Sequence, residues 1–262
     1  MSRSDFRKKK QILKGIGSKR RKASRKKFLP DIDGTPCRKG QGMKNRAVTD
    51  WNVYYRKPFF LSKYTRSILR KRLLRAVRKY LPDRHAFDVA ELGGGASCYM
   101  CAIMHNFTVR KYHIFDNNAE ALQITAACAG TDYESAIVLH ENDLLTEPGT
   151  EQLDCNLVFS GGLIEHFKPE DTAELVRLHF EKAATGGVVI LLFPVRSLLY
   201  RITRALAELF RCWIFHDERP LTDQEVLADA QDYGELLHKE TIHSIMLSQS
   251  MMVFRKKSPE AK

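Results

Sequence analysis

The sequence predicts an α/β protein with a doubly wound, mostly parallel sheet of seven strands. Two observations lead to this expectation. From residue 87 onward, short apolar segments typical of strands alternate with segments of helical periodicity, an order that places helices on both faces of a parallel sheet. In addition, a run of glycines at residues 93–95 ends the first strand, where it lets the backbone turn sharply into the first helix.

The individual elements follow from the same patterns. Gly186 and Gly187 are expected to turn the chain into the fifth strand, and Thr222 with Glu225 forms a capping box at the start of the last helix. The expected strands are apolar runs bounded by turn residues, at 88–92, 111–115, 137–140, 153–159, 188–193, 235–242 and 245–254. The expected helices between them lie at 96–106, 119–129, 169–184 and 222–234.

The N-terminal part of the chain carries nearly all of the excess positive charge. Residues 1–48 hold 17 Lys and Arg against 3 Asp and Glu, whereas the rest holds 26 against 28. Such dense like charge with few apolar groups cannot build a core, so this arm is expected to be disordered when free. A solubilising tail, an attraction of residues 1–30 to RNA, and an attraction to an anionic membrane surface all stay open. A transit peptide fits less well, because the lysines are clustered.

Residues 49–84 are expected to form an N-terminal cap, ahead of the α/β domain at 85–258. An aromatic segment at 51–60 precedes a basic helical stretch at about 62–80, whose apolar stripe is typical of core contact. Tyr54, Tyr55 and Phe60 are candidates for closing over a ligand, with core packing as the alternative.

Residues 196–217 form an insertion after the fifth strand that is rich in leucine, arginine and aromatic residues. An amphipathic helix in this insertion would cover an apolar substrate, lie on a membrane surface, or pack against the core. Together with Tyr55, Tyr200 of this segment is a candidate substrate contact.

Several classes of protein are disfavoured. The six cysteines fall mostly in expected helices and strands, which suits reduced thiols. Cys98 and Cys101 form a C-x-x-C pair, but no second pair or suitably spaced histidine completes a zinc site, so no metal is expected. No apolar stretch approaches the ~20 residues that cross a bilayer, and no secretory signal is recognisable. We expect a cytoplasmic protein, with a peripheral position at the membrane as the open alternative.

The segment Glu91-Leu92-Gly93-Gly94-Gly95-Ala96-Ser97, followed by Asp116 and Asp143 after the next two strands, resembles the motifs of class I S-adenosylmethionine-dependent methyltransferases. The resemblance spans roughly residues 85–255 and departs from the family pattern at Ser97, where a third glycine is usual. It implies a Rossmann-like sheet and S-adenosylmethionine as cofactor. Dehydrogenases that bind NAD are disfavoured because the G-x-G-x-x-G spacing is missing.

The same resemblance implies roles for individual residues in binding the cofactor. Its methionine part would lie against Gly93 and Gly95 and meet the backbone of Ser160 and Gly161. Glu91 would orient the glycine loop or contact the amino group. The ribose hydroxyls would bind Asp116, and the adenine would bind the Asp143 carboxylate and the Leu144 amide.

A second segment, Leu163-Ile164-Glu165-His166, resembles the one that follows the fourth strand in quinone-biosynthesis and related small-molecule methyltransferases. It implies His166 as a general base toward a hydroxyl group, with Glu165 orienting it or contacting the substrate. Gly162 stands where some quinone O-methyltransferases have a further glutamate, which disfavours a metal-assisted reaction.

The expected function is methyl transfer to a small-molecule or lipid-linked acceptor, with an oxygen atom as the favoured acceptor. The residues that follow the fourth strand do not match the Asn/Asp-Pro-Pro-Tyr/Phe motif of enzymes that methylate base nitrogens. Two alternatives remain: an RNA methyltransferase that holds its substrate with the basic arm, and a cofactor-binding protein without catalysis.

Overall fold

The computed structural model describes residues 49–56, 62–81, 85–147, 149, 152–210, 213–243 and 248–258. The arm expected at residues 1–48 and Phe60 of the expected cap lie outside these described residues, and so do the proposed contacts of residues 1–30 with RNA or lipid.

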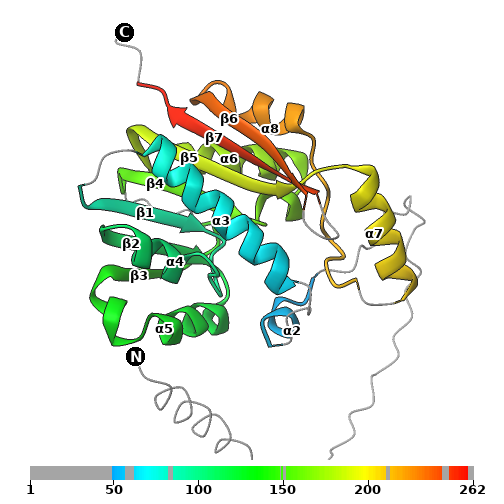
Figure 1. Cartoon of the computed structure of the whole chain (residues 1–262), viewed down its shortest axis with the longest axis horizontal. Helices are drawn as coiled ribbons and strands as arrows, with labels where there is room; N and C mark the ends of the chain where they lie inside the picture. The colour runs from blue at the N-terminus through cyan, green and yellow to red at the C-terminus, as the bar shows by residue number, and fades with distance from the viewer. Residues whose placement is uncertain are drawn as a thin grey trace, which may run out of the picture. The chain divides into compact units, whose positions relative to one another are not determined.

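The centre of the protein is a sheet of seven strands in the order β3-β2-β1-β4-β5-β7-β6, which confirms the predicted fold class (Figure 1). The first five strands in this order, β3 to β5, are parallel to one another. Strand β7 lies between β5 and β6 and is antiparallel to both. The strands span Phe87–Leu92 (β1), Val109–Asp116 (β2), Ile137–Glu141 (β3), Cys155–Gly161 (β4), Ala183–Pro194 (β5), Gly234–His243 (β6) and Ser248–Lys256 (β7).

Helices cover both faces of this sheet, as a parallel sheet requires. In Figure 1, α3, α4 and α5 lie in front of the strands, and α6 and α8 lie behind them. The α-helices span Trp51–Arg56 (α2), Ser62–Tyr80 (α3), Met100–Asn106 (α4), Ala119–Tyr133 (α5), Pro169–Lys182 (α6), Leu198–Leu209 (α7) and Asp223–Ala230 (α8). Two short 3-10 helices span Glu134–Ala136 (η1) and Ile164–His166 (η2).

Two separate hydrophobic cores form because side chains alternate between the faces of each strand. Leu157 and Phe159 of β4 pack in the core beneath α3, α4 and α5. Val158, the residue between them, packs in the core beneath α6 and α8. All three side chains are fully buried, so both faces of the strand stabilise the fold.

Two local expectations are wrong. The helix expected from residue 96 begins at Met100, because the Ser97 hydroxyl accepts hydrogen bonds from the amides of Tyr99 (3.1 Å) and Met100 (2.9 Å) and holds the preceding residues in a turn. Gly186 lies within β5 rather than in a turn before it. Its positive φ of 73° accompanies a bulge where the register of β5 against β4 shifts.

The strand order reverses at β1, and this positions the site. The chain builds β1, β2 and β3 outward on one side, and then returns to place β4 on the other side of β1. The loops that leave the carboxyl ends of β1 and β4 therefore diverge and open a crevice between them.

Candidate functional site

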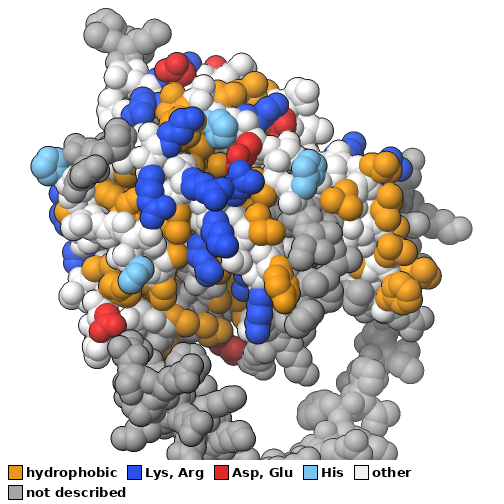
Figure 2. Space-filling model, in the orientation of Figure 1, with side chains coloured by type: hydrophobic (Ala, Val, Ile, Leu, Met, Phe, Trp, Pro, Cys, Tyr) orange, Lys and Arg blue, Asp and Glu red, His pale blue; other side chains and the backbone are white. Residues whose placement is uncertain are grey.

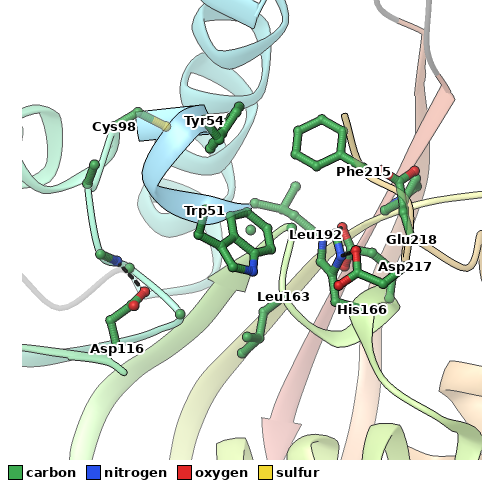
Figure 3. A pocket seen from close by; sticks show the side chains of 18 of the residues that line it. Trp51, Tyr54, Cys98, Asp116, Leu163, His166, Leu192, Phe215, Asp217 and Glu218 are labelled. Atoms are coloured by element: carbon green, nitrogen blue, oxygen red, sulfur yellow. Dashed lines mark hydrogen bonds and ion pairs between the residues drawn. The ribbon is translucent and has the colours of Figure 1, made fainter. Parts of the chain in front are cut away.

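A cavity of about 700 Å³ lies at the carboxyl ends of the parallel strands. Residues of the loops after β1 to β4 line it, together with residues of α2, α3 and α7. Figure 3 shows Asp116 at one side of this cavity and His166 with Asp217 at the other, with Trp51 of α2 between them.

The glycine loop after β1 leaves no space for side chains. Gly93 has a φ of +67°, and a Cβ atom there would stand 2.7 Å from Leu163 Cδ1. A Cβ atom at Gly95 would stand 2.7 Å from both Ala121 Cβ and the Asp116 carboxylate. The exposed backbone that results can approach a bound molecule closely.

Two buried carboxyl groups hold this loop. Asp116 Oδ2 accepts a hydrogen bond of 2.7 Å from the Gly95 amide, and its Oδ1 accepts one of 2.9 Å from the Asn118 amide. Glu91 Oε2 accepts 2.7 Å hydrogen bonds from the hydroxyls of Ser97 and Tyr112. Burial raises the pKa of Asp116, and it raises the pKa of Glu91 to about 7.

The loop after β3 contributes the next part of the cavity. Asp143 accepts hydrogen bonds from the amides of Leu145 (2.9 Å) and Thr146 (3.3 Å), which turns the chain so that Leu144 faces the cavity. The neighbouring Asn142 Oδ1 is buried and has no hydrogen-bond partner within the described part of the chain. This end of the cavity therefore offers an unused acceptor for a donor such as an amino group.

His166 and Asp217 form a hydrogen-bonded pair at the opposite end. His166 Nδ1 lies 3.1 Å from Asp217 Oδ1, which also accepts a hydrogen bond from the Thr49 hydroxyl. The edge of the Trp51 ring packs against the imidazole, with the centroids 4.9 Å apart.

The charge states of this pair follow from burial and from the neighbouring carboxylates. Burial alone would lower the pKa of His166, but the hydrogen bond to Asp217 and the charges of Glu165, Asp217 and Glu218 outweigh it and raise that pKa. Burial of Asp217 opposes its ionisation, yet the hydrogen bonds from His166 and Thr49 lower its pKa to about 2. Asp217 is thus an ionised acceptor that keeps the proton of His166 on Nδ1 and leaves Nε2 free to take another.

Two further carboxyl groups surround the histidine. Glu165 Oε1 lies 4.0 Å from His166 Nε2, while Glu165 Oε2 is buried without a partner among the residues that the structure describes. Burial raises the pKa of Glu165 to about 7 and also raises the pKa of Glu218. Glu218 is held by Tyr200, whose hydroxyl donates a hydrogen bond of 2.7 Å to its carboxylate.

Ten of the twelve residues proposed from the sequence line this one cavity: Tyr55, Glu91, Gly93, Gly95, Asp116, Asp143, Leu144, Gly161, Glu165 and His166. The other two do not. Ser160, the last residue but one of β4, is fully buried and does not line the cavity. Tyr200, expected to contact substrate, is buried on α7, and its hydroxyl donates a hydrogen bond to the carboxylate of Glu218, which lines the cavity.

Sequence reasoning missed Asp217 and Glu218, which lie in the loop before α8. No motif marks them, since they lie about 50 positions after His166 and meet it only through the fold. It also did not single out Arg66, which donates a hydrogen bond to the Tyr54 hydroxyl in the cavity wall. Among the described residues, no group of three or more His, Cys, Asp and Glu side chains is arranged to hold a metal ion.

No protein-family model matches the sequence, and no curated protein matches it significantly. The structure, however, is similar to solved structures of methyltransferases. One is N-methyltransferase NodS from Bradyrhizobium japonicum WM9 in complex with S-adenosylhomocysteine, with a TM-score of 0.56, 12% identity, and coverage of 73% of this chain and 88% of NodS. A second is magnesium protoporphyrin IX methyltransferase ChlM from Synechocystis PCC 6803 with bound S-adenosylhomocysteine, with a TM-score of 0.62, 11% identity, and coverage of 79% and 94%.

A third similar structure is the S-adenosylmethionine-dependent methyltransferase SibL in its apo form, with a TM-score of 0.60, 15% identity, and coverage of 79% of this chain and 59% of SibL. These similarities show that the chain has the class I methyltransferase fold, as the motifs predicted. Within the described ranges, no helix is long and apolar enough to cross a membrane.

Proposed function

We propose that this chain transfers a methyl group from S-adenosylmethionine to an oxygen atom of a small-molecule or lipid-linked acceptor. One observation carries the proposal: a single cavity joins the glycine loop and Asp116 at one end to a histidine–aspartate pair at the other. Methyl transfer needs a cofactor site and an acceptor site that share one enclosed space.

The residues at the first end fit S-adenosylmethionine. At Gly93 and Gly95 the neighbouring protein atoms leave no room for a side chain, so bare backbone faces the cavity and a methionine chain can lie along it. Each oxygen of Asp116 accepts one backbone hydrogen bond and has a lone pair left for a ribose hydroxyl. The unpartnered Asn142 Oδ1, beside Asp143 and Leu144, suits the amino group of adenine. When bound, this cofactor supplies a methyl group already activated by its sulfonium.

The second end fits an acceptor hydroxyl. Because Asp217 keeps the imidazole proton on Nδ1, Nε2 of His166 can accept the proton that a hydroxyl loses as it becomes a nucleophile. The resulting imidazolium would be stabilised by Asp217 and by the ionised form of Glu165. Glu165 Oε2, buried and unpartnered, offers an additional acceptor for a polar group of the substrate.

Aromatic side chains exclude water around this end. Trp51, Tyr54 and Phe215 contact one another, with ring centroids between 5.1 and 6.1 Å apart. Such a wall favours a substrate with an apolar or aromatic body and a polar reacting group.

The test is to incubate the purified full chain with methyl-tritiated S-adenosylmethionine and fractionated cell extract. Gly93→Asp is the inactive control, because its side chain would collide with Leu163 at a position with positive φ. Label in the lipid or small-molecule fraction, absent with the control, supports the proposal. Label in the RNA fraction would overturn it.

Calorimetric titration with S-adenosylhomocysteine separates binding from catalysis. If the wild-type chain binds this product and Gly93→Asp does not, but no fraction is labelled, then the chain is a cofactor-binding protein without this activity. The methyl-transfer proposal would then fail while the cofactor site stands.

A further inference from the structure

An apolar face of α7 is exposed to solvent. Of the eleven large hydrophobic side chains that are exposed within the described ranges, six lie on α7 or directly after it: Leu198, Leu199, Ile202, Leu206, Leu209 and Phe210. Leu198, Leu209 and Phe210 are 70%, 72% and 73% exposed. Figure 2 shows these hydrophobic side chains as a band along α7. A patch of this density marks an interaction surface.

The opposite side of α7 is anchored, so its apolar face cannot simply turn inward. Ser197 caps the helix by accepting a hydrogen bond of 3.0 Å from the Tyr200 amide. Tyr200 is buried and binds Glu218, while Arg204 Nη1 donates a hydrogen bond of 2.8 Å to the Glu218 carbonyl. These contacts fix the rotation of the helix, and Leu198, Ile202 and Leu209 therefore stay outward.

Basic side chains are exposed on the same side of the molecule as this face (Figure 2). Arg196 and Arg201 are exposed beside it, and the exposed Glu208 of α7 is paired with Arg204 at 2.8 Å. In the view that displays α7, Lys and Arg side chains gather over α3 (Figure 2), whose exposed basic residues are Lys63, Lys71, Arg75, Arg78 and Lys79. Residues 1–48 add a net 14 positive charges to the same chain.

We propose that this face of α7 docks on an anionic lipid bilayer. A helix of 12 residues is about 18 Å long and too short to cross a bilayer, but it can lie in the interface with its apolar face inserted. The charge distinguishes this occupant from a second copy of the chain, because the net charge of +12 makes two whole chains repel each other, whereas an anionic membrane attracts each of them.

Docking would bring the candidate site to the membrane. Leu206, Ala207 and Phe210, on or next to the exposed face, also line the cavity. A lipid-linked acceptor could therefore enter the cavity from the bilayer along α7. This delivery rests on the proposed function, whereas the docking itself does not.

The experiment measures binding of the full chain to sedimented vesicles, without cofactor or acceptor. The vesicles contain phosphatidylcholine and phosphatidylglycerol in equal parts, or phosphatidylcholine alone. The test variant is Ile202→Gln with Leu209→Gln, at two exposed positions outside the cavity. The matched control is Ile124→Gln, at an exposed isoleucine of α5.

We expect the wild-type chain and Ile124→Gln to bind the anionic vesicles more tightly than the neutral ones. The double variant should lose about tenfold or more in partitioning, because two apolar side chains no longer enter the bilayer. With brominated lipid, a tryptophan in Leu209→Trp should be quenched more than one in Ile124→Trp, since only the former enters the bilayer.

Two outcomes would overturn the proposal. The first is that the double variant binds vesicles as tightly as the wild-type chain and that Leu209→Trp shows no extra quenching. This result would assign membrane binding to the basic residues alone. The second is no vesicle binding together with a wild-type dimer that the double variant dissociates, which would make α7 an interface between copies. Neither outcome depends on turnover, so the proposed methyl transfer could stand or fail separately.

Discussion

At the end of the cavity that we propose for the acceptor, the protonation state of His166 is set by its neighbours. Burial favours neutral His166, whereas Asp217, Glu165 and Glu218 favour its protonated form, and the carboxylates prevail. His166 is therefore a stronger base than an ordinary histidine. Because Asp217 is ionised with a pKa of about 2, this effect persists across the physiological pH range.

Replacing Asp217 by Asn should weaken the base and displace its titration. We expect kcat to fall by about 100-fold or more, since both the orientation and the basicity of His166 depend on this partner. The acidic limb of the pH–rate profile should move to lower pH, because the pKa of His166 drops when the charge of Asp217 is removed. Asp132→Asn, at an exposed position of α5, is the control. A limb that stays in place would show that Asp217 does not set the active protonation state.

Gly95→Ala should weaken cofactor binding without changing the fold. Its Cβ would stand 2.7 Å from Ala121 Cβ and from the Asp116 carboxylate, so the loop or the carboxylate must shift. We expect about tenfold or greater loss of affinity for S-adenosylhomocysteine by calorimetry. Gly130→Ala, strained at a φ of +57° but with no atom within 4 Å of its Cβ, serves as the control. Equal loss of affinity in both variants would indicate a general loss of stability rather than a local collision.

At the scale of elements, α2 forms part of the cavity wall although it has only six residues. A helix this short is not stable alone, and its position depends on contacts with distant parts of the chain. Thr49, just before it, binds Asp217, and Asn52 accepts a hydrogen bond of 2.8 Å from Asn118. These contacts join the His166–Asp217 end of the cavity to the start of α5, which follows Asp116.

Trp51→Ala should open this wall and expose His166 to water. We expect kcat/KM for the acceptor to fall by about tenfold or more, with most of the effect in KM, because Trp51 shapes the space beside the imidazole. Trp51→Phe should recover most of the loss by keeping an aromatic ring. Steady-state kinetics with the labelled acceptor fraction measure both variants. Unchanged kinetics in Trp51→Ala would place the acceptor elsewhere.

At the scale of the whole molecule, the fold includes a histidine that has no role in the cavity. His179 of α6 is fully buried, and its Nδ1 lies 2.7 Å from the Leu175 carbonyl. Burial lowers its pKa from 6.5 to about 4. The native state thus requires the neutral form, whereas the unfolded chain accepts a proton more readily.

The contribution of His179 to stability should be fully present above about pH 6.5 and lost progressively as the pH falls toward 4. At pH 5 we expect the wild-type free energy of unfolding to have lost about 2 kcal/mol from this group. Buried Glu91 and Glu165, whose pKa values are raised to about 7, act in the opposite direction. Comparison with His179→Gln, which cannot titrate, isolates the histidine.

Urea unfolding at pH 7 and at pH 5 measures this difference. Between pH 7 and pH 5, the free energy of unfolding of the wild-type chain should fall by about 2 kcal/mol relative to that of His179→Gln. A gap that is the same at both pH values would show that His179 does not titrate with unfolding.

The sequence alone predicted the seven-stranded fold and the end of the cavity that holds the glycine loop, Asp116 and Asp143. Both follow from local patterns, because strand and helix periodicity, the glycines at 93–95, and single acids at strand ends each act within a few residues of the chain. In a parallel sheet the carboxyl ends of the strands lie at one edge, so Asp116 and Asp143 could be placed together before the structure was known.

Only the tertiary structure assembled the opposite end, around His166 and Asp217. Asp217 reaches His166 only because the segment after α7 folds back over η2, where the Arg219 amide donates a hydrogen bond to the Glu165 carbonyl. Tyr200 could not be assigned from its position in an amphipathic helix, because its direction depends on the buried carboxylate of Glu218. The physical reason is the range of the interactions. Neighbouring residues in the sequence determine backbone geometry and side-chain alternation. Hydrogen bonds between distant segments, and pKa shifts caused by burial, form only when the chain has folded.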